Sequence, residues 1–392
     1  MNFKKILFVI LALNLIFRIG YILIGVDNSK YYFEDTIHYY SAAESIVDNG
    51  NFGVDPERPP TPFGLEPGYP LFLALIVFIF GKGFLWIRIV QSIIITLSGY
   101  IFYKTLRMFV DERFSMLGTI YYLFYPFYIF FSGFLYPESI YMPLLVTFVY
   151  FFFRYYNNSR INDFLVSVFV LVIMYHTKAP SIVLFPILFG LPIYMKIKKR
   201  ENKVYLKIIL GLILFILIST PWLVRNYKVY HSITITRNYT RKSFEQEDNI
   251  KKSGHGSAKN YINEKLSELK FSKFVDQVKR YYSPFFDEVQ KNSNFYDEIN
   301  SKQNKKRIIL RSISFIFTIP WLIAFVVLPI FKNNGKEILL IYVTAIFLAM
   351  PFIILHSNTR YRLPTDFLYL MIFTIFVKKL FEKFKHEKIT DN

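Results

Sequence analysis

Long apolar runs alternate with short polar connections along most of the chain. The first run, Ile6–Ile24, follows Lys4 and Lys5 and is close to the roughly 20 residues that a helix needs to cross a bilayer. No small-residue cleavage site follows it, and it is longer than the apolar part of a secretory signal, so it is predicted to be a retained transmembrane helix. The pattern as a whole predicts an all-α polytopic membrane protein.

The apolar segment Tyr69–Phe80 is too short to span a membrane and is expected to be re-entrant or to lie in the interface. Counting the later apolar runs as spans gives about ten transmembrane helices in total, accompanied by juxtamembrane helices on the outer side. They are Phe84–Tyr103, Phe114–Ser132, Ser139–Phe153, Phe164–Tyr175, Ser181–Met195, Tyr205–Thr220, Ile308–Ile330, Ile338–Leu355 and Phe367–Val377.

The distribution of basic residues supports the count of about ten transmembrane helices. If Tyr69–Phe80 does not span, every basic cluster in a short loop falls on one side, together with both termini, as the positive-inside rule requires. These clusters are Lys104/Arg107/Arg113, Arg154/Arg160, Lys196/Lys198/Lys199/Arg200/Lys203, Lys332/Lys336 and Lys378/Lys379/Lys383/Lys385/Lys388. The net charge of +19 therefore reflects membrane orientation rather than nucleic acid binding. Cysteine is absent, which excludes disulfides and thiolate metal sites.

The predicted topology leaves five outer segments and divides the chain into three parts. The outer segments are Asp27–Glu66, Gly133–Glu138, His176–Pro180, Arg225–Lys306 and His356–Pro364. Residues 1–224 form an N-terminal transmembrane catalytic module with outer loop 27–66. Residues 225–306 form an outer loop or small subdomain, and residues 307–392 form a C-terminal transmembrane module with a basic cytoplasmic tail. The sequence does not decide whether 225–306 is folded or a mobile flap.

Two acidic positions are candidates for chemistry on the outer side. Glu34 and Asp35 start a helix-patterned run just after the first span, where Asp35, Tyr39 and Ala43 share one side. A carboxylate there can take a proton from a hydroxyl. Glu138, which follows Pro137, lies on the same side. Helix capping is the structural alternative for Asp35, and helix initiation after proline is the alternative for Glu138.

Single cations in short outer loops are the second candidate feature, because such loops are normally poor in Lys and Arg. They are Lys178, Arg225, Arg360 and Arg362. A guanidinium group presents a fork of donors that fits phosphate oxygens. Interfacial snorkelling beside aromatic residues is the alternative.

Metal and nucleotide sites have little support in the sequence. His38, His176, His255 and His356 show no HxxxH or His-x-x-Glu spacing, and a divalent ion held by Asp35 and Glu138 stays an open alternative. We therefore expect no cofactor. No phosphate-cradling glycine loop and no GxSxG motif is present, so side-chain cations would have to bind any phosphate donor.

Several motifs occur in an order that resembles a known family. They are Asp-x3-Tyr-x3-Ala from Asp35, Pro-Gly-Tyr-Pro-Leu at Pro67–Leu71, Glu138, Pro-Trp-x2-Arg-Asn at Pro221–Asn226 and Arg-Tyr-Arg-Leu-Pro at Arg360–Pro364. Over nearly the whole chain, the sequence resembles the GT-C superfamily of glycosyltransferases, and specifically the group of protein O-mannosyltransferases and aminoarabinose lipid A transferases.

The resemblance implies a GT-C-like fold and a multi-pass enzyme of the cell membrane with its active site on the extracytoplasmic side. It implies that a sugar is transferred, with inversion, from a polyprenyl phosphate to a protein, lipid or glycan acceptor. Asp35 would be the general base, Glu138 would position the sugar or acceptor, and Lys178, Arg225, Arg360 and Arg362 would hold the phosphate. Supporting positions are Glu34, Tyr39, Tyr69, His356 and Tyr361. Two departures are that Lys178 stands where relatives tend to have Arg, and that no large soluble domain follows the last span.

Two other functions are compatible with the same pattern. A polymerase or ligase of lipid-linked polysaccharide would share the cationic outer face without needing an acid after the first span. A flippase or transporter of lipid-linked sugar would usually need ionisable residues at mid-membrane depth, and the predicted spans keep nearly all charges at their ends.

Overall fold

The structure is a computed structural model of the 392-residue chain and describes residues 3–29, 34–55, 64–198, 203–231, 233, 271–283, 304–331, 335–355 and 359–390. These residues are organised as helices and connecting turns. The α-helices are α1 (Phe3–Gly25), α2 (Glu34–Asn49), α3 (Gly68–Phe80), α4 (Leu85–Leu106), α5 (Glu112–Leu123), α6 (Pro126–Ser132), α7 (Glu138–Asn158), α8 (Ile161–Thr177), α9 (Leu184–Ile197), α10 (Val204–Tyr230), α13 (Phe271–Tyr281), α16 (Asn304–Val327), α17 (Lys336–Leu355), α18 (Thr359–Arg362) and α19 (Asp366–Thr390). Short 3-10 turns, η1 (Ala179–Val183), η2 (Leu328–Ile330) and η3 (Leu363–Thr365), join several of them.

A helix is present at every run that the sequence predicts to span. By length and composition, six helices of the described chain can cross a membrane, or seven if the bent pair α5–α6 counts as one span. The structure therefore supports a multi-pass helical protein, while the predicted number of about ten spans is not confirmed. Helices α7, α8 and α19 occupy predicted spans but do not meet the same length and composition test.

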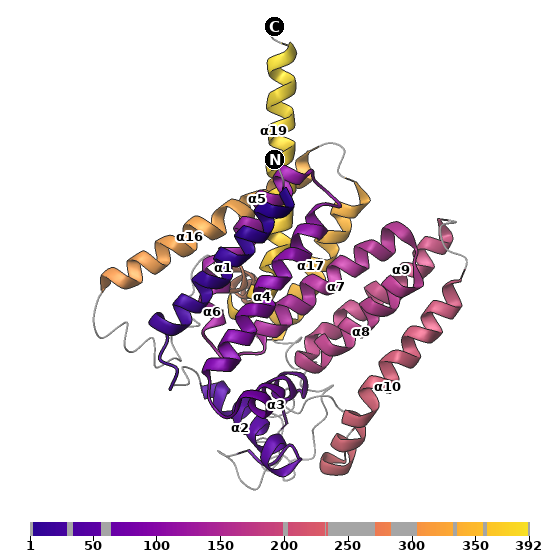
Figure 1. The fold of residues 1–392 in the computed structure, drawn as a ribbon. Coiled ribbons are helices and arrows are strands. Elements are labelled where there is room, and N and C mark those ends of the chain that lie inside the picture. The colour runs from indigo at the N-terminus through magenta and orange to yellow at the C-terminus, as the bar shows by residue number, and fades with distance from the viewer. Residues whose placement is uncertain are drawn as a thin grey trace.

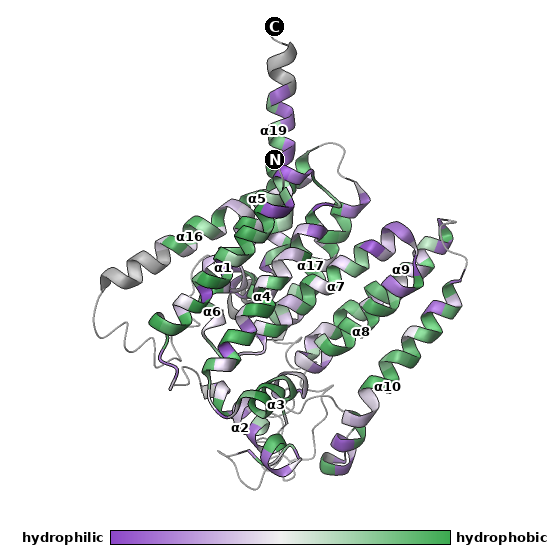
Figure 2. Cartoon of the chain, viewed as in Figure 1, coloured by the Kyte–Doolittle hydropathy of each residue, from purple (hydrophilic) through white to green (hydrophobic). Residues whose placement is uncertain are grey.

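The helices form an elongated bundle whose two termini lie at the same end (Figure 1). Helices α2 and α3 lie at the opposite end, which we call the distal end. Hydrophobic residues cover the long helices, while hydrophilic residues gather at their ends and on α2 (Figure 2). The two termini and α2 therefore lie at opposite ends of the bundle, and the sides of the membrane that these ends face stay a prediction.

Helix α3 has the length and surface of an interfacial helix. It has 13 residues, and one side, including Tyr69 and Leu73, packs in a buried cluster with Ala43 of α2. Its other side is also apolar but exposed, with Leu75 and Phe78 at 57% and 76% accessibility. A helix that is apolar on both sides and polar on neither suits contact with protein on one side and lipid on the other. The short length agrees with the prediction that Tyr69–Phe80 does not span.

The predicted span Phe114–Ser132 is broken into α5 and α6, which meet at an angle of 44°. Pro126 lacks an N–H group and cannot continue the helical hydrogen bonding. Arg18 donates from Nη1 to the Tyr128 carbonyl (2.7 Å) and from Nη2 to the Leu123 carbonyl (3.2 Å), to which Asn14 also donates (2.7 Å). Side chains of α1 thus satisfy the carbonyls that the break exposes, which is how irregular backbone is tolerated at membrane depth.

The expectation that the spans are nearly free of ionisable residues needs correction. Arg18 in α1 and Arg88 in α4 are both fully buried side chains. Arg88 donates to the carbonyls of Gly133 (2.8 Å) and Asp27 (3.1 Å). Both arginines therefore bind backbone carbonyls where helices end or break, a structural use that the pattern of apolar runs did not reveal.

Candidate functional site

The first acidic pair lies at the start of α2. Asp35 is exposed in the first turn of this helix, and the Glu34 side chain is outside the described residues. The next residue, Thr36, is buried and its hydroxyl donates to the Leu135 carbonyl (3.2 Å). Leu135 precedes α7, whose first residue is Glu138. The beginnings of α2 and α7 are therefore held together, and the two predicted catalytic acids belong to neighbouring segments.

Glu138 forms a buried ion pair with Lys178. The Lys178 Nζ lies 2.9 Å from Glu138 Oε1, and the side chains are 12% and 3% exposed, respectively. Lys178 follows the last residue of α8, and its ammonium group also lies over two rings, at 4.7 Å from the centroid of Tyr361 and 5.5 Å from that of Phe352. The prediction placed Lys178 on a donor phosphate; in this structure its charge is directed to Glu138.

Glu66 is a third acid at this place, and the sequence reasoning treated it only as the end of a loop. It is 8% exposed, and its carboxylate accepts from the Ala179 N–H at 3.4 Å. Burial raises its pKa; the nearby Lys178 lowers it in part, and Glu138 adds to the increase. A Glu directly before the Pro-Gly-Tyr-Pro motif was the available signal. Two buried carboxylates thus share the neighbourhood of one lysine.

The Pro-Gly-Tyr-Pro motif packs the start of α3 onto the end of α8. A Cβ at Gly68 would lie 2.6 Å from the Thr177 Oγ1 and 2.8 Å from the His176 carbonyl oxygen, so only glycine fits. The Tyr69 hydroxyl donates to Gln91 Oε1 (2.8 Å). The Tyr69 ring packs edge-on against Tyr39 of α2, with centroids 5.3 Å apart. Tyr69 and Tyr39, predicted as supporting residues, therefore join α2, α3 and α4.

Arg362 is fully buried and is bound by groups of the protein. Its Nε donates to Asp366 Oδ1 (2.8 Å), and its Nη1 donates to the carbonyls of Tyr281 (3.2 Å) and Ser283 (2.7 Å). The guanidinium group lies over the Trp321 ring at 5.0 Å. In this structure the fork predicted for a phosphate instead holds α13 against the C-terminal helices. The i,i+4 spacing of Arg362 and Asp366 was the sequence signal for this pair.

Of the other two predicted cations, Arg225 and Arg360, the structure describes the side chain of Arg225. Arg225, near the end of α10, bonds to its neighbour Asn226 (2.8 Å) and lies over the rings of Trp222 (4.8 Å) and Phe52 (5.5 Å). Phe52 belongs to the loop after α2, so Arg225 lies at the distal end. The side chain of Arg360 and the whole of His356 fall outside the described residues. Tyr361 borders Lys178.

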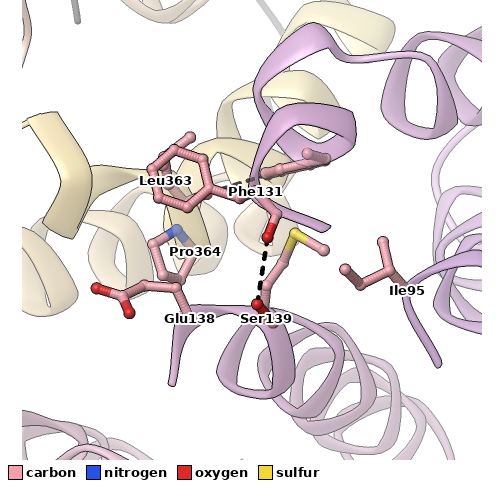
Figure 3. Close-up of a pocket in the computed structure, with 8 residues that line it drawn as sticks. Ile95, Phe131, Glu138, Ser139, Leu363 and Pro364 are labelled. Atoms are coloured by element: carbon pink, nitrogen blue, oxygen red, sulfur yellow. Dashed lines mark hydrogen bonds between the residues drawn. The ribbon is translucent and has the colours of Figure 1, made fainter. Parts of the chain in front are cut away.

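A small pocket opens beside Glu138 (Figure 3). It is lined by Ile95, Tyr128, Phe131, Glu138, Ser139, Met142, Leu363 and Pro364. The free space, about 10 Å³, is about that of one water molecule and is too small for a sugar ring. Figure 3 shows the Glu138 side chain beside Pro364 of η3. The pocket therefore marks where the start of α7 meets the turn after α18.

The histidines and acids do not form a metal cluster among the residues that the structure describes: no three of His, Asp or Glu gather in a suitable group. His38 contacts Asp55, with Nδ1 3.1 Å from Oδ1. His176 Nε2 lies 3.1 Å from the Ser219 hydroxyl. His255 lies outside the described residues. His38 and His176 thus contact loop and helix neighbours.

Known proteins share this fold. Residues 59–224 match the family model described as dolichyl-phosphate-mannose-protein mannosyltransferase. The structure is similar to that of the oligosaccharyltransferase AglB from Archaeoglobus fulgidus in complex with an inhibitory peptide and a dolichol-phosphate, with a TM-score of 0.57 and 12% identity over 100% of this chain and 52% of that one. A second structure of the A. fulgidus oligosaccharyltransferase, tethered to an acceptor peptide, has a TM-score of 0.57 and 13% identity over 97% of this chain and 50% of that one. No curated protein matches the sequence.

A further similar structure is that of ArnT from Cupriavidus metallidurans in the apo state, with a TM-score of 0.42 and 11% identity over 95% of this chain and 76% of that one. The chain thus spans about half the length of the oligosaccharyltransferase structures that it matches. Its fold is similar to that of these membrane oligosaccharyltransferases. The family-model match and these folds support the resemblance inferred from the order of the motifs.

Proposed function

We propose that this protein is a membrane glycosyltransferase that transfers a sugar from a polyprenyl-phosphate donor to an acceptor hydroxyl at the outer face of the membrane. The observation that carries the proposal is the meeting of α2 and α7 within a GT-C fold. An exposed carboxylate, Asp35, starts one helix, and a buried carboxylate, Glu138, starts the other, while Thr36 and Leu135 connect them.

In the proposed reaction, Asp35 accepts the proton of the acceptor hydroxyl as the hydroxyl oxygen bonds to the anomeric carbon of the sugar. The bond between that carbon and the donor phosphate oxygen breaks at the same time, and the lipid phosphate leaves with both electrons of the bond. A single displacement of this kind inverts the anomeric carbon. Asp35 suits the role of base because its side chain is exposed in the first turn of α2, at the distal end.

Cations stabilise the departing phosphate, whose charge grows in the transition state. We assign this task to Arg225 and Arg360, and we assign orientation of the sugar or acceptor to Glu138. Lys178 and Arg362, which the sequence also placed on the phosphate, are engaged by Glu138 and Asp366. The exposed apolar side of α3 would let the prenyl chain stay in the bilayer while its head group reacts.

The test uses dolichyl-phosphate [³H]mannose, the donor class in the name of the matching family, with the protein in liposomes. Washed membranes from cells that lack the protein serve as the source of acceptor. We expect radioactivity to become covalently attached to one acceptor fraction. Asp35→Asn and Arg360→Ala should each fold and lose most of the transfer, typically by a factor of about 10²–10⁴ for the base.

Asp48→Asn is the matched control, since Asp48 lies on the same helix but pairs with Lys82 (2.6 Å). It should keep the wild-type rate. Transfer that survives in Asp35→Asn would favour a polymerase or ligase with another base. Movement of intact labelled lipid across the liposome membrane without covalent transfer would instead favour a flippase. Full activity of both Asp35→Asn and Arg360→Ala would overturn the proposed mechanism.

A further inference from the structure

The Lys178–Glu138 pair is enclosed on one side by aromatic rings that belong to the C-terminal part of the chain. Phe352 of α17 and Tyr361 of α18 stack almost parallel, with centroids 5.2 Å apart and an interplanar angle of 8°. The Lys178 ammonium group lies within 5.5 Å of both ring centroids. A cation in this position is attracted by the ring faces, and the attraction is stronger where water is excluded. The ring pair therefore fixes where the ammonium group can lie.

Helix α13 supports this ring pair from the other side. Its Tyr281 is buried with Phe352 and neighbouring residues of α17, and the partly buried Phe274, Val278 and Tyr361 pack against this cluster. Its opposite side carries charged residues such as Asp276 and Lys279, which are exposed. Arg362, directly after Tyr361, holds the end of α13 through the carbonyls of Tyr281 and Ser283. Adjacent residues of α18 thus bind α13 and border Lys178.

A continuous set of contacts therefore runs from α13 through the rings of Phe352 and Tyr361 to Lys178 and on to Glu138. Lys178 has a long, flexible side chain whose ordering costs conformational entropy. Without the rings, the ion pair with Glu138 alone would have to offset this loss of conformational entropy. With them, the ammonium group is restricted to the side of Glu138 that faces α18.

We infer that the Phe352–Tyr361 ring pair, supported by α13, positions Lys178 and through it orients the Glu138 carboxylate for the sugar or acceptor. This inference rests on the proposed function for its catalytic consequence, but its geometric part does not. It gives α13, which lies within the predicted outer segment 225–306, a task in the site. Tyr361 and Phe352 are positioning residues, because they act through Lys178.

The first test compares transfer rates in a double-mutant cycle. Tyr361→Leu removes the ring and should lower the rate about tenfold, whereas Tyr361→Phe keeps the ring and should retain most of the rate. In a Lys178→Met background, Tyr361→Leu should cause no further loss, because the rings act through the ammonium group. Tyr100→Leu is the matched control: it removes a ring that lies 4.9 Å from the Lys104 ammonium group at the opposite end of the bundle. A loss of equal size in both backgrounds would overturn the inference.

The second test does not depend on activity. Acetylation of lysines by an amine-reactive reagent is followed by mass spectrometry on the folded protein, with Lys82, whose side chain is 53% exposed, as the internal reference. Modification of Lys178 should be slow in wild type and Tyr361→Phe, and severalfold faster in Tyr361→Leu and in Val278→Ala of α13. Unchanged labelling of Lys178 in both of the latter variants would refute the positioning role. If labelling responds but no wild-type transfer is found, the proposed function fails and the positioning role stands.

Discussion

Gly68 provides the sharpest prediction for the packing that builds the site. Replacing it by alanine places a methyl group 2.6 Å from the Thr177 Oγ1, 2.8 Å from the His176 carbonyl oxygen and 2.9 Å from its carbon. The threonine hydroxyl can rotate away, but the His176 carbonyl is backbone at the end of α8. To reach ordinary contact, that carbonyl and α3 would have to separate by about 0.6 Å.

Overpacking of this kind typically lowers the free energy of unfolding by about 1–3 kcal/mol, and the better helix propensity of alanine offsets at most about 1 kcal/mol of this. We therefore expect the apparent melting temperature of purified Gly68→Ala to fall. Transfer activity should fall further than stability alone explains, because the displaced end of α8 carries Lys178, and the adjacent Ala179 N–H binds Glu66.

The control is Gly190→Ala in α9, where an added Cβ meets no atom within 4 Å. This variant should be as stable as wild type or slightly more so. Thermal unfolding in nanodiscs, followed by circular dichroism, and the mannose transfer assay give the two readouts. If Gly68→Ala matches Gly190→Ala in both, the close approach of α3 to α8 is not what the site depends on.

Three further variants test other contacts. Burial raises the pKa of Glu66, so the folded state disfavours the charged form of this side chain. The contribution of Glu66 to stability should therefore decline as the pH rises above 4.5 towards the raised pKa. Glu66→Gln should flatten this decline in a series of melting temperatures measured at different pH. Arg18→Met should destabilise the protein by about 1–3 kcal/mol because the Tyr128 carbonyl loses this donor while the Leu123 carbonyl keeps Asn14; an unchanged melting temperature would show that other groups satisfy the α5–α6 break. Asp366→Ala should lower the free energy of unfolding by about 3–5 kcal/mol because the Arg362 charge stays buried without its partner. The double variant Asp366→Leu/Arg362→Met should regain most of this stability. If it does not, the unpaired charge is not the cause of the destabilisation.

The sequence was informative wherever one physical rule dominates. Apolar runs located the helices, and the short run Tyr69–Phe80 forms a helix of only 13 residues, α3. Positive charge in the short loops predicted that the two termini share one side of the membrane; the two termini lie at one end of the bundle, and the side that this end faces stays a prediction. These features depend on local composition and so can be read without knowing which helices touch.

The site was predictable only in part, because its contacts join residues far apart in the chain. Spacing could place Glu138 and Lys178 on one side of the membrane, but only the fold shows that they form an ion pair. Glu66 was overlooked because a single acid in a loop gives no periodic signal. Arg362 was predicted to bind the donor phosphate because exposed and buried arginines look alike in a sequence. Its partners Tyr281 and Ser283 lie some 80 residues away in the chain.

The use of Arg18 and Asn14 bears on how the chain is assembled. Ribosomal synthesis and membrane insertion proceed from the N-terminus, so α1 is in the bilayer before α5 and α6 emerge. The donors that the bent segment requires are therefore already waiting when its carbonyls reach the hydrocarbon layer. A chain in which α1 inserts late or is supplied separately should accumulate with α5–α6 open to proteases, while the wild-type order of synthesis protects it.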